Sequence, residues 1–342
     1  MAEPITIAVD AMGGDAGAAV CVPASIEFVR RHPGVRIILV GQSETLEPLA
    51  AAAGGLPAGV GIRDARQIVA MDEPPADALR KKKDSSMRVA VDLVKEGAAN
   101  ACVSAGNTGA LMATGRFVLK TLPGIERPAI MARLPTRHGS ISMLDLGANA
   151  DCTVEQLYQF AVMGSVVASV TEGMDRPRIG LLNIGEEDIK GNDIVKQAAV
   201  RLGASRLNYI GFVEADAIQD DRADVVVCDG FSGNVALKSM EGTARLIKHF
   251  LEIEFRGSVD AGDFRSGQPY GRLAGLVAWP VLRSLGRRLD PRRYNGASLV
   301  GLDGIVIKSH GGADALAFQQ AIRVARVEAE KGVPDQIREL LS

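Results

Sequence analysis

Six short segments of the sequence contain glycine, and five of them also contain Asn, Lys or His, residue types that bind anions. They are VDAMGGD (9–15), SAGNTGA (104–110), DLGAN (145–149), NIGEEDIKGND (183–193), DGFSGNVALKS (229–239) and KSHGGADA (308–315). Glycine lets a ligand approach the backbone N–H groups closely, Asn supplies neutral donors, and Lys supplies a positive charge. This chemistry is typical of a phosphate-binding site.

Two of these segments, 104–110 and 308–315, are each expected to open a helix. The N-terminus of a helix carries free N–H groups and a partial positive charge, which favour an anion. The alternative is that each glycine-rich segment is only a tight turn between a strand and a helix. That alternative weakens when all six segments are taken together.

Familiar catalytic motifs do not occur in these segments. The sequence has neither G-x-x-x-x-G-K-[ST] nor G-x-G-x-x-G, and GFSGN does not match the G-x-S-x-G elbow of hydrolases. Of the four histidines, only His310 lies in such a segment. The carboxylates of Asp10, Asp15, Glu186 and Asp229 could bind a metal, but Asp in such turns more often accepts hydrogen bonds from turn amides. We therefore expect no metal site.

The elements that must position these segments form an alternating pattern. Short, nearly continuous apolar runs predict strands at 5–9, 36–40, 101–104, 140–144, 178–184, 207–212, 224–229 and 304–308. Helical patterns lie between them, and the clearest begins at Thr153, which has capping-box spacing to Gln156. The alternation predicts a three-layer α/β/α sandwich with a largely parallel sheet. Ligands bind such sheets at the carboxyl ends of the strands, so one composite site on one edge is expected.

Residues 242–293 interrupt this pattern. No convincing strand occurs there, and 243–255 has a helical pattern, so we predict a helical excursion within a single catalytic domain, 1–342. Its segment LAGLVAWPVL (273–282) carries no charge and is followed by Arg283, Arg287 and Arg288. This composition suits a helix lying on anionic lipid, but burial in a dimer interface or in the core is equally compatible.

Composition limits the class of protein. The 342 residues are 47% hydrophobic and carry a net charge of −2, which argues against nucleic-acid binding through bulk charge. The four cysteines are far apart and form no CxxC pair, so neither a zinc site nor a disulfide framework is indicated, and a reducing cytoplasmic compartment is expected. No signal peptide or membrane-spanning run is expected.

The run RKKKDSSM (80–87) places four cations before a helix start expected at Ser85 or Ser86. A solvated charged turn is the usual explanation for such a run. An anion site, or a docking patch for an acidic partner, is the alternative.

Seven motifs in order carry a resemblance to one family. VDAMGGD, KKDSSM, SAGNTGA, DLGAN, NIGEEDIKG, DGFSGNVALK and GLDGIVIKSHGG resemble the bacterial phosphate acyltransferases, the acyl-ACP:phosphate transacylases of the PlsX family, from about Ile5 to Arg326. The resemblance implies transfer of a fatty acyl group from acyl carrier protein (ACP) to inorganic phosphate, the entry step of phosphatidic acid synthesis.

The same resemblance implies a fold akin to phosphotransacetylase and isopropylmalate dehydrogenase. It also implies a homodimer, no organic cofactor, and peripheral association of a cytoplasmic protein with the membrane, where the downstream glycerol-3-phosphate acyltransferase is a candidate partner. Two departures are visible. Gly312 and Ala313 follow the His-Gly pair where the family commonly has hydroxyl residues, and YNGAS (294–298) differs from the usual pattern.

The chemistry of this reaction needs no Ser or Cys nucleophile, because phosphate can attack a thioester directly. Positioning and fixed donors can supply most of the catalysis. The expected catalytic residues are Lys190, Lys308, His310 and Asn107, with His310 as a possible proton donor to the departing thiolate. The expected substrate-binding residues are Asp10, Gly13, Gly14, Ser85, Ser86, Ser104, Gly106, Thr108, Gly109, Asn149, Asn234 and Gly311.

Two rival functions remain at this stage. A dehydrogenase on a similar fold would need a dinucleotide fingerprint with an acidic ribose ligand, and neither is evident. A non-catalytic scaffold at the membrane would have no reason to keep six ligand-type segments.

Overall fold

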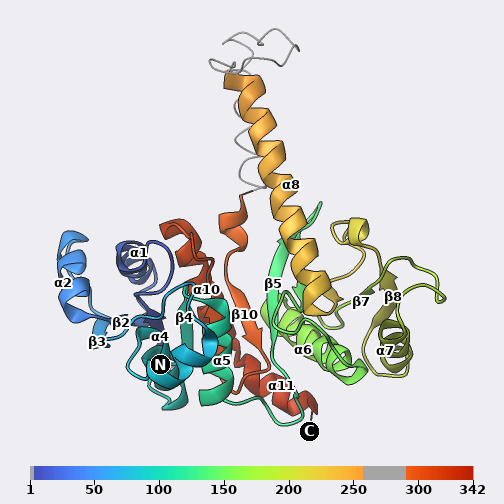
Figure 1. Ribbon diagram of the computed structural model, residues 1–342, viewed down its shortest axis with the longest axis horizontal. Coiled ribbons are helices and arrows are strands. Elements are labelled where there is room, and N and C mark those ends of the chain that lie inside the picture. The colour runs from blue at the N-terminus through green and yellow to red at the C-terminus, as the bar shows by residue number, and fades with distance from the viewer. Residues whose placement is uncertain (1–3, 257–289, 342) are drawn as a thin grey trace. The chain divides into compact units, whose positions relative to one another are not determined.

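The computed structural model describes residues 4–256 and 290–341, and its strands form one sheet of eleven (Figure 1). The order across the sheet is β3-β2-β1-β4-β11-β10-β5-β6-β9-β7-β8. The strands are β1 (Ile5–Asp10), β2 (Val35–Gly41), β3 (Val60–Asp64), β4 (Ala101–Ser104), β5 (Ala129–Pro135), β6 (Ser140–Leu144), β7 (Ile179–Leu182), β8 (Tyr209–Val213), β9 (Val225–Val227), β10 (Ala297–Val300) and β11 (Ile305–Lys308).

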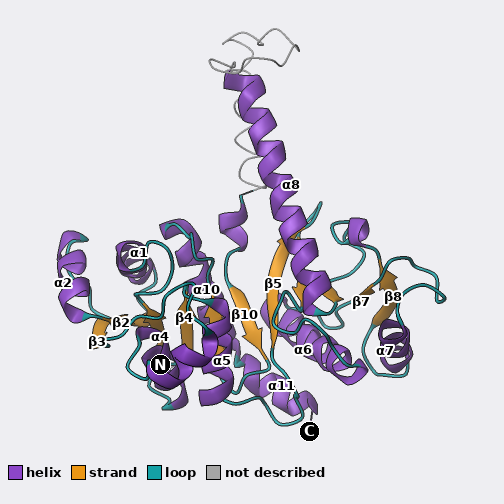
Figure 2. Cartoon of the chain, viewed as in Figure 1, coloured by secondary structure: helices purple, strands orange, loops and turns teal. Residues whose placement is uncertain are grey.

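Helices cover both faces of this sheet (Figure 2). The α-helices are α1 (Ala18–Arg31), α2 (Ser43–Ala52), α3 (Pro75–Lys81), α4 (Ser86–Lys95), α5 (Thr108–Val118), α6 (Val154–Glu172), α7 (Asp193–Gly203), α8 (Gly230–Arg256), α10 (Ala315–Lys331) and α11 (Val333–Leu341). Short 3-10 helices span Ala215–Ala217 (η1) and Pro291–Tyr294 (η2). The predicted α/β class with a mostly parallel sheet is confirmed.

Two hydrophobic cores lie under these helices. One joins α1 and α10 to β1, β2, β4 and β11, around Phe28 and Phe318. The other joins α6, α7 and α11 to β5, β6, β7 and β9, around Phe160. The predicted capping box at the start of α6 is confirmed, since Thr153 Oγ1 accepts from Gln156 N and Gln156 Oε1 accepts from Thr153 N.

The chain divides into two compact units. One comprises residues 1–233 and 292–342 and contains the whole sheet, and the other comprises residues 234–291. Most of the predicted excursion, including 273–282 and Arg283, Arg287 and Arg288, lies outside the described residues. Among the helices that are described, none has the length and apolar character needed to cross a membrane.

The strand directions contradict the prediction that all six polar segments meet at one edge. Strands β1, β2, β3, β4 and β11 are mutually parallel, as are β6, β7, β8 and β9. Three successive antiparallel pairings, β11 with β10, β10 with β5 and β5 with β6, separate the two groups. Because three reversals invert the direction, the carboxyl ends of the two groups lie on opposite edges of the sheet.

The prediction of a loop at 229–239 is also wrong, because α8 begins at Gly230. Asp229 stabilises the first turn by accepting hydrogen bonds from Ser232 N (2.8 Å) and Ser232 Oγ (2.9 Å). The two glycines allow close packing rather than flexibility. A Cβ atom at Gly233 would lie 1.9 Å from Asp145 O, and one at Gly230 would lie 2.6 Å from Asn149 O.

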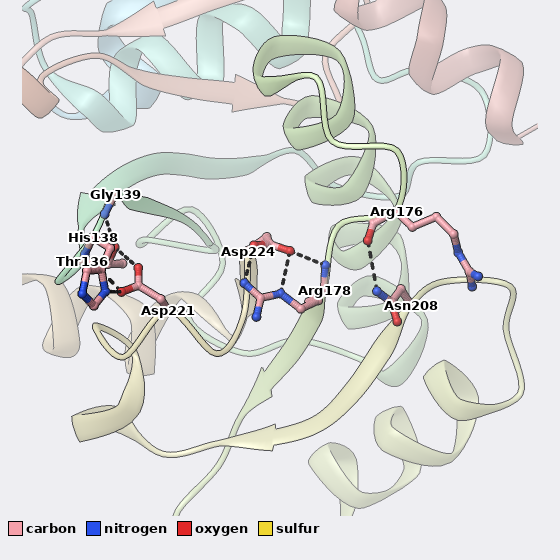
Figure 3. A network of polar contacts seen from close by, with 8 residues as sticks. All are labelled: Thr136, His138, Gly139, Arg176, Arg178, Asn208, Asp221 and Asp224. Carbon is pink, nitrogen blue, oxygen red and sulfur yellow. Dashed lines mark hydrogen bonds and ion pairs between the residues drawn. The ribbon is translucent and has the colours of Figure 1, made fainter.

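A polar network fixes the amino ends of β7, β8 and β9 (Figure 3). The guanidinium of Arg178 binds both carboxylate oxygens of Asp224, at 3.0 and 2.8 Å. Thr136 and His138, in the turn between β5 and β6, both bind the Asp221 carboxylate. His138 therefore has a structural partner, remote from the carboxyl ends of these strands.

Candidate active site

Three of the expected site residues form a row at the carboxyl ends of neighbouring strands. Asp10 of β1 is the register partner of Ser104 of β4, and Ser104 is the register partner of Lys308 of β11. Because β4 lies between the other two strands, the sheet itself fixes the spacing of these side chains. The predicted clustering of the segments after β1, β4 and β11 is therefore observed.

A chain of hydrogen bonds connects Asp10 to the loop after β4. Ser104 Oγ donates to Asp10 Oδ2 at 2.6 Å, and Gly106 N donates to Ser104 Oγ at 3.0 Å. Asp10 and Ser104 are both buried. Burial raises the pKa of Asp10, and hydrogen bonds from Ser104 and Ser86 partly oppose that rise. The Gly106 N–H is thus used inside the loop, so it is not a free donor for an anion.

Lys308 holds two loops together rather than facing solvent. Its side chain is buried, with 9% of the residue exposed, and its Nζ donates to Ala105 O at 3.2 Å and to Ser309 O. These carbonyls belong to the loops after β4 and β11. The contacts assign Lys308 a positioning role in this structure.

Glycines let the loops after β1, β4 and β11 touch. A Cβ atom at Gly13 would lie 2.7 Å from Gly106 N, and one at Gly14, whose φ is +95°, would lie 2.9 Å from Gly311 O. Asp15 N also donates to Gly311 O at 2.9 Å. Side chains at these positions would force the loops apart, which explains the glycine-rich composition by close packing.

The bare loop after β4 opens α5, as predicted, and Asn107 is the N-cap of that helix. Asn107 Oδ1 accepts from Ala110 N at 3.0 Å, and its Nδ2 donates to Met71 O (2.8 Å) and Glu73 O (3.0 Å). The side-chain amide is therefore fully used. The exposed N–H groups of Thr108 and Gly109 have no hydrogen-bond partner within residues 4–256 and 290–341, so they can bind an anion.

His310 lies exposed just beyond β11. Its backbone N–H donates to Asn295 Oδ1 at 2.9 Å, and its Nδ1 accepts from Gly312 N at 3.1 Å. Because Nδ1 is an acceptor, the proton of the neutral imidazole sits on Nε2. Asn295, which no sequence pattern indicated, positions the backbone of this histidine and also donates to Ser309 Oγ. Its segment, 294–298, carried no signal beyond its departure from the family pattern.

Lys190 lies in the loop after β7, on the other group of strands. Its side chain is 45% exposed and forms an ion pair with Glu187 at 3.1 Å. The loop is held from within, since Asn183 Nδ2 donates to Gly185 O (3.0 Å) and to Lys190 O (3.2 Å). Lys190 is thus an accessible cation on an ordered loop.

The remaining expected site residues differ in burial and in the contacts that they make. Asn149 is buried, and its Nδ2 donates to Pro128 O and to Asp145 Oδ2, both at 2.9 Å. Ser85 is the N-cap of α4, and Ser86 is buried beside Asp10. Asn234 is exposed on α8, in the second unit. Asn149 and Ser85 are thus occupied in folding their own segments.

All four cysteines of the chain are buried and unpaired. Burial raises the pKa of each thiol above its usual range, that of Cys152 to about 12. None is therefore a reactive thiolate at neutral pH. No group of three His, Cys, Asp or Glu side chains within the described residues is arranged to hold a metal ion.

Comparison with known proteins identifies the family. The model of the family described as "Fatty acid synthesis protein" matches residues 5–336. The chain belongs to this family. It is 58% identical to the phosphate acyltransferase of Alkalilimnicola ehrlichii over 342 residues, covering 100% of this chain and 97% of the relative. It is 57% identical to the phosphate acyltransferase of Halorhodospira halophila, covering 98% and 96%.

Solved structures show the same fold. A phosphotransacetylase from Streptococcus pyogenes matches with a TM-score of 0.62 and 18% identity, covering 96% of this chain and 95% of that one. The EutD phosphotransacetylase from Staphylococcus aureus matches with a TM-score of 0.58 and 16% identity, covering 95% and 94%. The expected phosphotransacetylase-like fold is therefore confirmed, and the family membership makes the chain an acyltransferase.

Proposed function

We propose that this acyltransferase moves a fatty acyl group from acyl-ACP to inorganic phosphate and so supplies acyl-phosphate for phosphatidic acid synthesis. The observation that carries the proposal is the 58% identity to a protein named phosphate acyltransferase, with both chains covered almost completely. Phosphate as the acceptor follows from that name. ACP as the donor and the role in phospholipid synthesis rest on the motif resemblance.

The proposed reaction is a direct displacement. A phosphate oxygen forms a bond to the thioester carbon, the C–S bond breaks, and the departing thiolate takes up a proton. The buried thiols support this route, because none of them can form an acyl-enzyme, and the Ser104 hydroxyl is buried between Asp10 and Gly106. The protein then has to position phosphate and stabilise the oxyanion of the tetrahedral intermediate.

We assign contact with the substrates to hydrogen-bond donors and cations that remain accessible. The N–H groups of Thr108 and Gly109 would bind phosphate, and the Nε2–H of His310 would donate a hydrogen bond to the departing thiolate sulfur, which then takes its proton from solvent. Lys190 would stabilise the oxyanion. Residues whose side chains bind neighbouring loops, Lys308 and Asn107 among them, would hold the loops in place instead. Asp10, Gly13, Gly14, Ser86, Ser104, Gly106 and Gly311 would complete the packed floor of the site.

The twist of the sheet would allow the loops after β4 and β7 to contribute to one site, although these strands run in opposite directions. Strands β4 and β7 are six steps apart in the sheet. A usual twist of 20–25° per step rotates the strand axis by roughly 120–150° across six steps. Since the two strands also run in opposite senses, their directions would differ by roughly 30–60°. The loop after β4, which carries the Thr108 and Gly109 N–H groups, and the loop that carries Lys190 would then face the same side.

Partners and location complete the proposal. ACP is expected to be acidic, and Arg80 and Lys83 are exposed cations beside paired Lys81 and Lys82. These four residues are the proposed docking patch in the described part of the chain. We also propose a cytoplasmic homodimer that associates peripherally with the membrane. Residues 1–342 would form one catalytic domain, with 242–293 serving dimer or membrane contact.

The test is to incubate the purified full chain with palmitoyl-ACP and phosphate. We expect acyl-phosphate and free ACP in equal amounts, with no product when phosphate is omitted. Saturable binding of a nicotinamide cofactor without acyl-phosphate formation would overturn the proposal in favour of a dehydrogenase. Absence of acyl-phosphate from a correctly folded sample would also overturn it.

A further inference from the structure

We infer that Ile184 and Ile189 bind the alkyl chain of the acyl donor and select for long chains. This inference rests on the proposed function, specifically on Lys190 as the oxyanion-stabilising residue. Both isoleucines lie in the loop after β7 that carries Lys190. Their exposed fractions, 79% and 83%, are the highest among the large hydrophobic residues of 4–250 and 290–341.

Internal contacts hold this loop in one shape. Glu186 forms an ion pair with Arg222, and Glu187 forms one with Lys190. Gly191 has a φ of +91°, and a Cβ atom there would lie 2.2 Å from Asn183 Oδ1. The loop is therefore packed tightly around the Asn183 amide. The exposure of the isoleucines results from this fixed shape.

The same amide joins the two ends of the loop beside the isoleucines. Asn183 Nδ2 donates to Gly185 O and to Lys190 O, the carbonyls of the residues that directly follow Ile184 and Ile189. Both carbonyls lie within 3.2 Å of one nitrogen atom. Each isoleucine is therefore one residue away from the point where the loop closes on itself, at Lys190.

The alkyl chain is the expected occupant of this surface because it is covalently attached to the reacting carbonyl. In an acyl donor, the first methylene is bonded directly to the carbonyl carbon. If Lys190 stabilises the oxyanion on that carbon, the first part of the alkyl chain must pass within a few bond lengths of this loop. Exposed isoleucines beside a reacting carbonyl would bury methylenes, each of which favours an apolar contact over water. A fatty alkyl chain fits this surface, whereas phosphate does not.

The test compares donors of different length. The double variant Ile184→Ser with Ile189→Ser is assayed with palmitoyl-ACP and with acetyl-ACP, each with phosphate. We expect kcat/KM for palmitoyl-ACP to fall about 10-fold or more, as loss of contact with several methylenes requires. For acetyl-ACP, whose chain is a single methyl group, we expect a change of about 2-fold or less. The melting temperature should stay the same, because both side chains are exposed.

Val200→Ser is the matched control. Val200 is 75% exposed on α7, outside the loop, so its replacement should leave the ratio between the two donors unchanged. An equal loss with both donors, or no loss with either, would overturn the inference while acyl transfer by the unmodified protein upheld the proposed function. A change in oligomeric state of the double variant would overturn it in favour of a contact between copies. If the unmodified protein makes no acyl-phosphate, both proposals fail.

Discussion

Ser104 Oγ donates a hydrogen bond to Asp10 Oδ2 at 2.6 Å and accepts one from Gly106 N at 3.0 Å, so one buried hydroxyl connects two strands and a loop. The contact lies at the register pair that joins β1 to β4. The shape of the loop before α5 therefore depends on a side chain that no solvent or ligand needs to touch.

Replacing Ser104 with Ala should lower the free energy of unfolding by about 1–3 kcal/mol, because Asp10 and Gly106 N both lose a partner inside the protein. Urea denaturation measures the change. Ser25→Ala is the control, since the Ser25 hydroxyl is equally buried but has no hydrogen-bond partner in the described chain. Equal losses in the two variants would show that the Ser104 contacts contribute nothing special.

Replacing Asn107 with Ala should reduce stability more than Asn192→Ala does. Both residues are N-caps, and loss of a cap costs about 1 kcal/mol. Only Asn107 also binds Met71 O and Glu73 O. Asn107→Asp should keep the cap acceptor and lose the tether, so its stability should lie between that of the unmodified protein and Asn107→Ala. A roughly 10²-fold loss of kcat/KM without any change in stability would instead identify Asn107 as an oxyanion donor.

Substitution of Lys190 should affect turnover, whereas substitution of Lys308 should affect stability. Lys190→Ala should leave stability within about 0.5 kcal/mol and lower turnover by roughly 10²-fold or more, because Lys190 is exposed and proposed to act on substrate. Lys308→Ala should instead lower the free energy of unfolding by about 1–3 kcal/mol, since two carbonyls lose a buried donor. Exposed Lys331 on α10 offers a control substitution. Normal phosphate kinetics in Lys190→Ala would remove this residue from the site.

Glu328 should make stability depend on pH. It is buried on α10, accepts a hydrogen bond from Ser298 Oγ at 3.0 Å, and its pKa is raised to about 7 by burial. The folded protein then holds a proton that the unfolded chain releases near pH 4.5, the ordinary value. This contribution is fully present below pH 4.5 and is lost as pH rises through 7, by up to ~3 kcal/mol.

Glu328→Gln tests that dependence by urea denaturation at pH 5.5 and pH 8. The amide cannot ionise, so the variant should gain stability over the unmodified protein at pH 8 and show a smaller difference between the two pH values. A parallel shift at both pH values would contradict the expected titration.

Local sequence patterns predicted most elements but not how they pair. The apolar runs predicted eight of the strands, including β6 before DLGAN. The capping-box spacing predicted the start of α6. Strands β3, β5 and β10 escaped because their signals are weak. β3 is an edge strand with polar Arg63 and Asp64, and β5 carries Arg133 and Pro135. β10 begins with Ala297 and Ser298, so only two of its residues are large and apolar.

Strand direction is set by contacts between residues far apart in the chain, so local patterns could not reveal that β6, β7 and β9 oppose β1 and β4. The glycines of 229–239 led to a wrong prediction of a loop, and the reason is related. Gly230 and Gly233 are small because α8 packs onto the backbone of residues 145–149, and that neighbour is not visible from a local window. For the candidate site, residue chemistry indicated that the loops after β1, β4 and β11 lie together, but it could not distinguish a buried amide such as Asn149 from an accessible cation such as Lys190.

The position of β11 between β4 and β10 has a consequence for synthesis of the chain on the ribosome. Strand β4 ends at Ser104, but the strand that covers its open side begins at Ile305, about 200 residues later. At about 5–20 residues per second, the nascent chain carries this exposed edge for roughly 10–40 seconds. Unpaired strand edges attract other chains. A ribosome-associated chaperone, or slow docking of the preceding helices, would be needed to protect that edge until about the last ninth of the protein emerges.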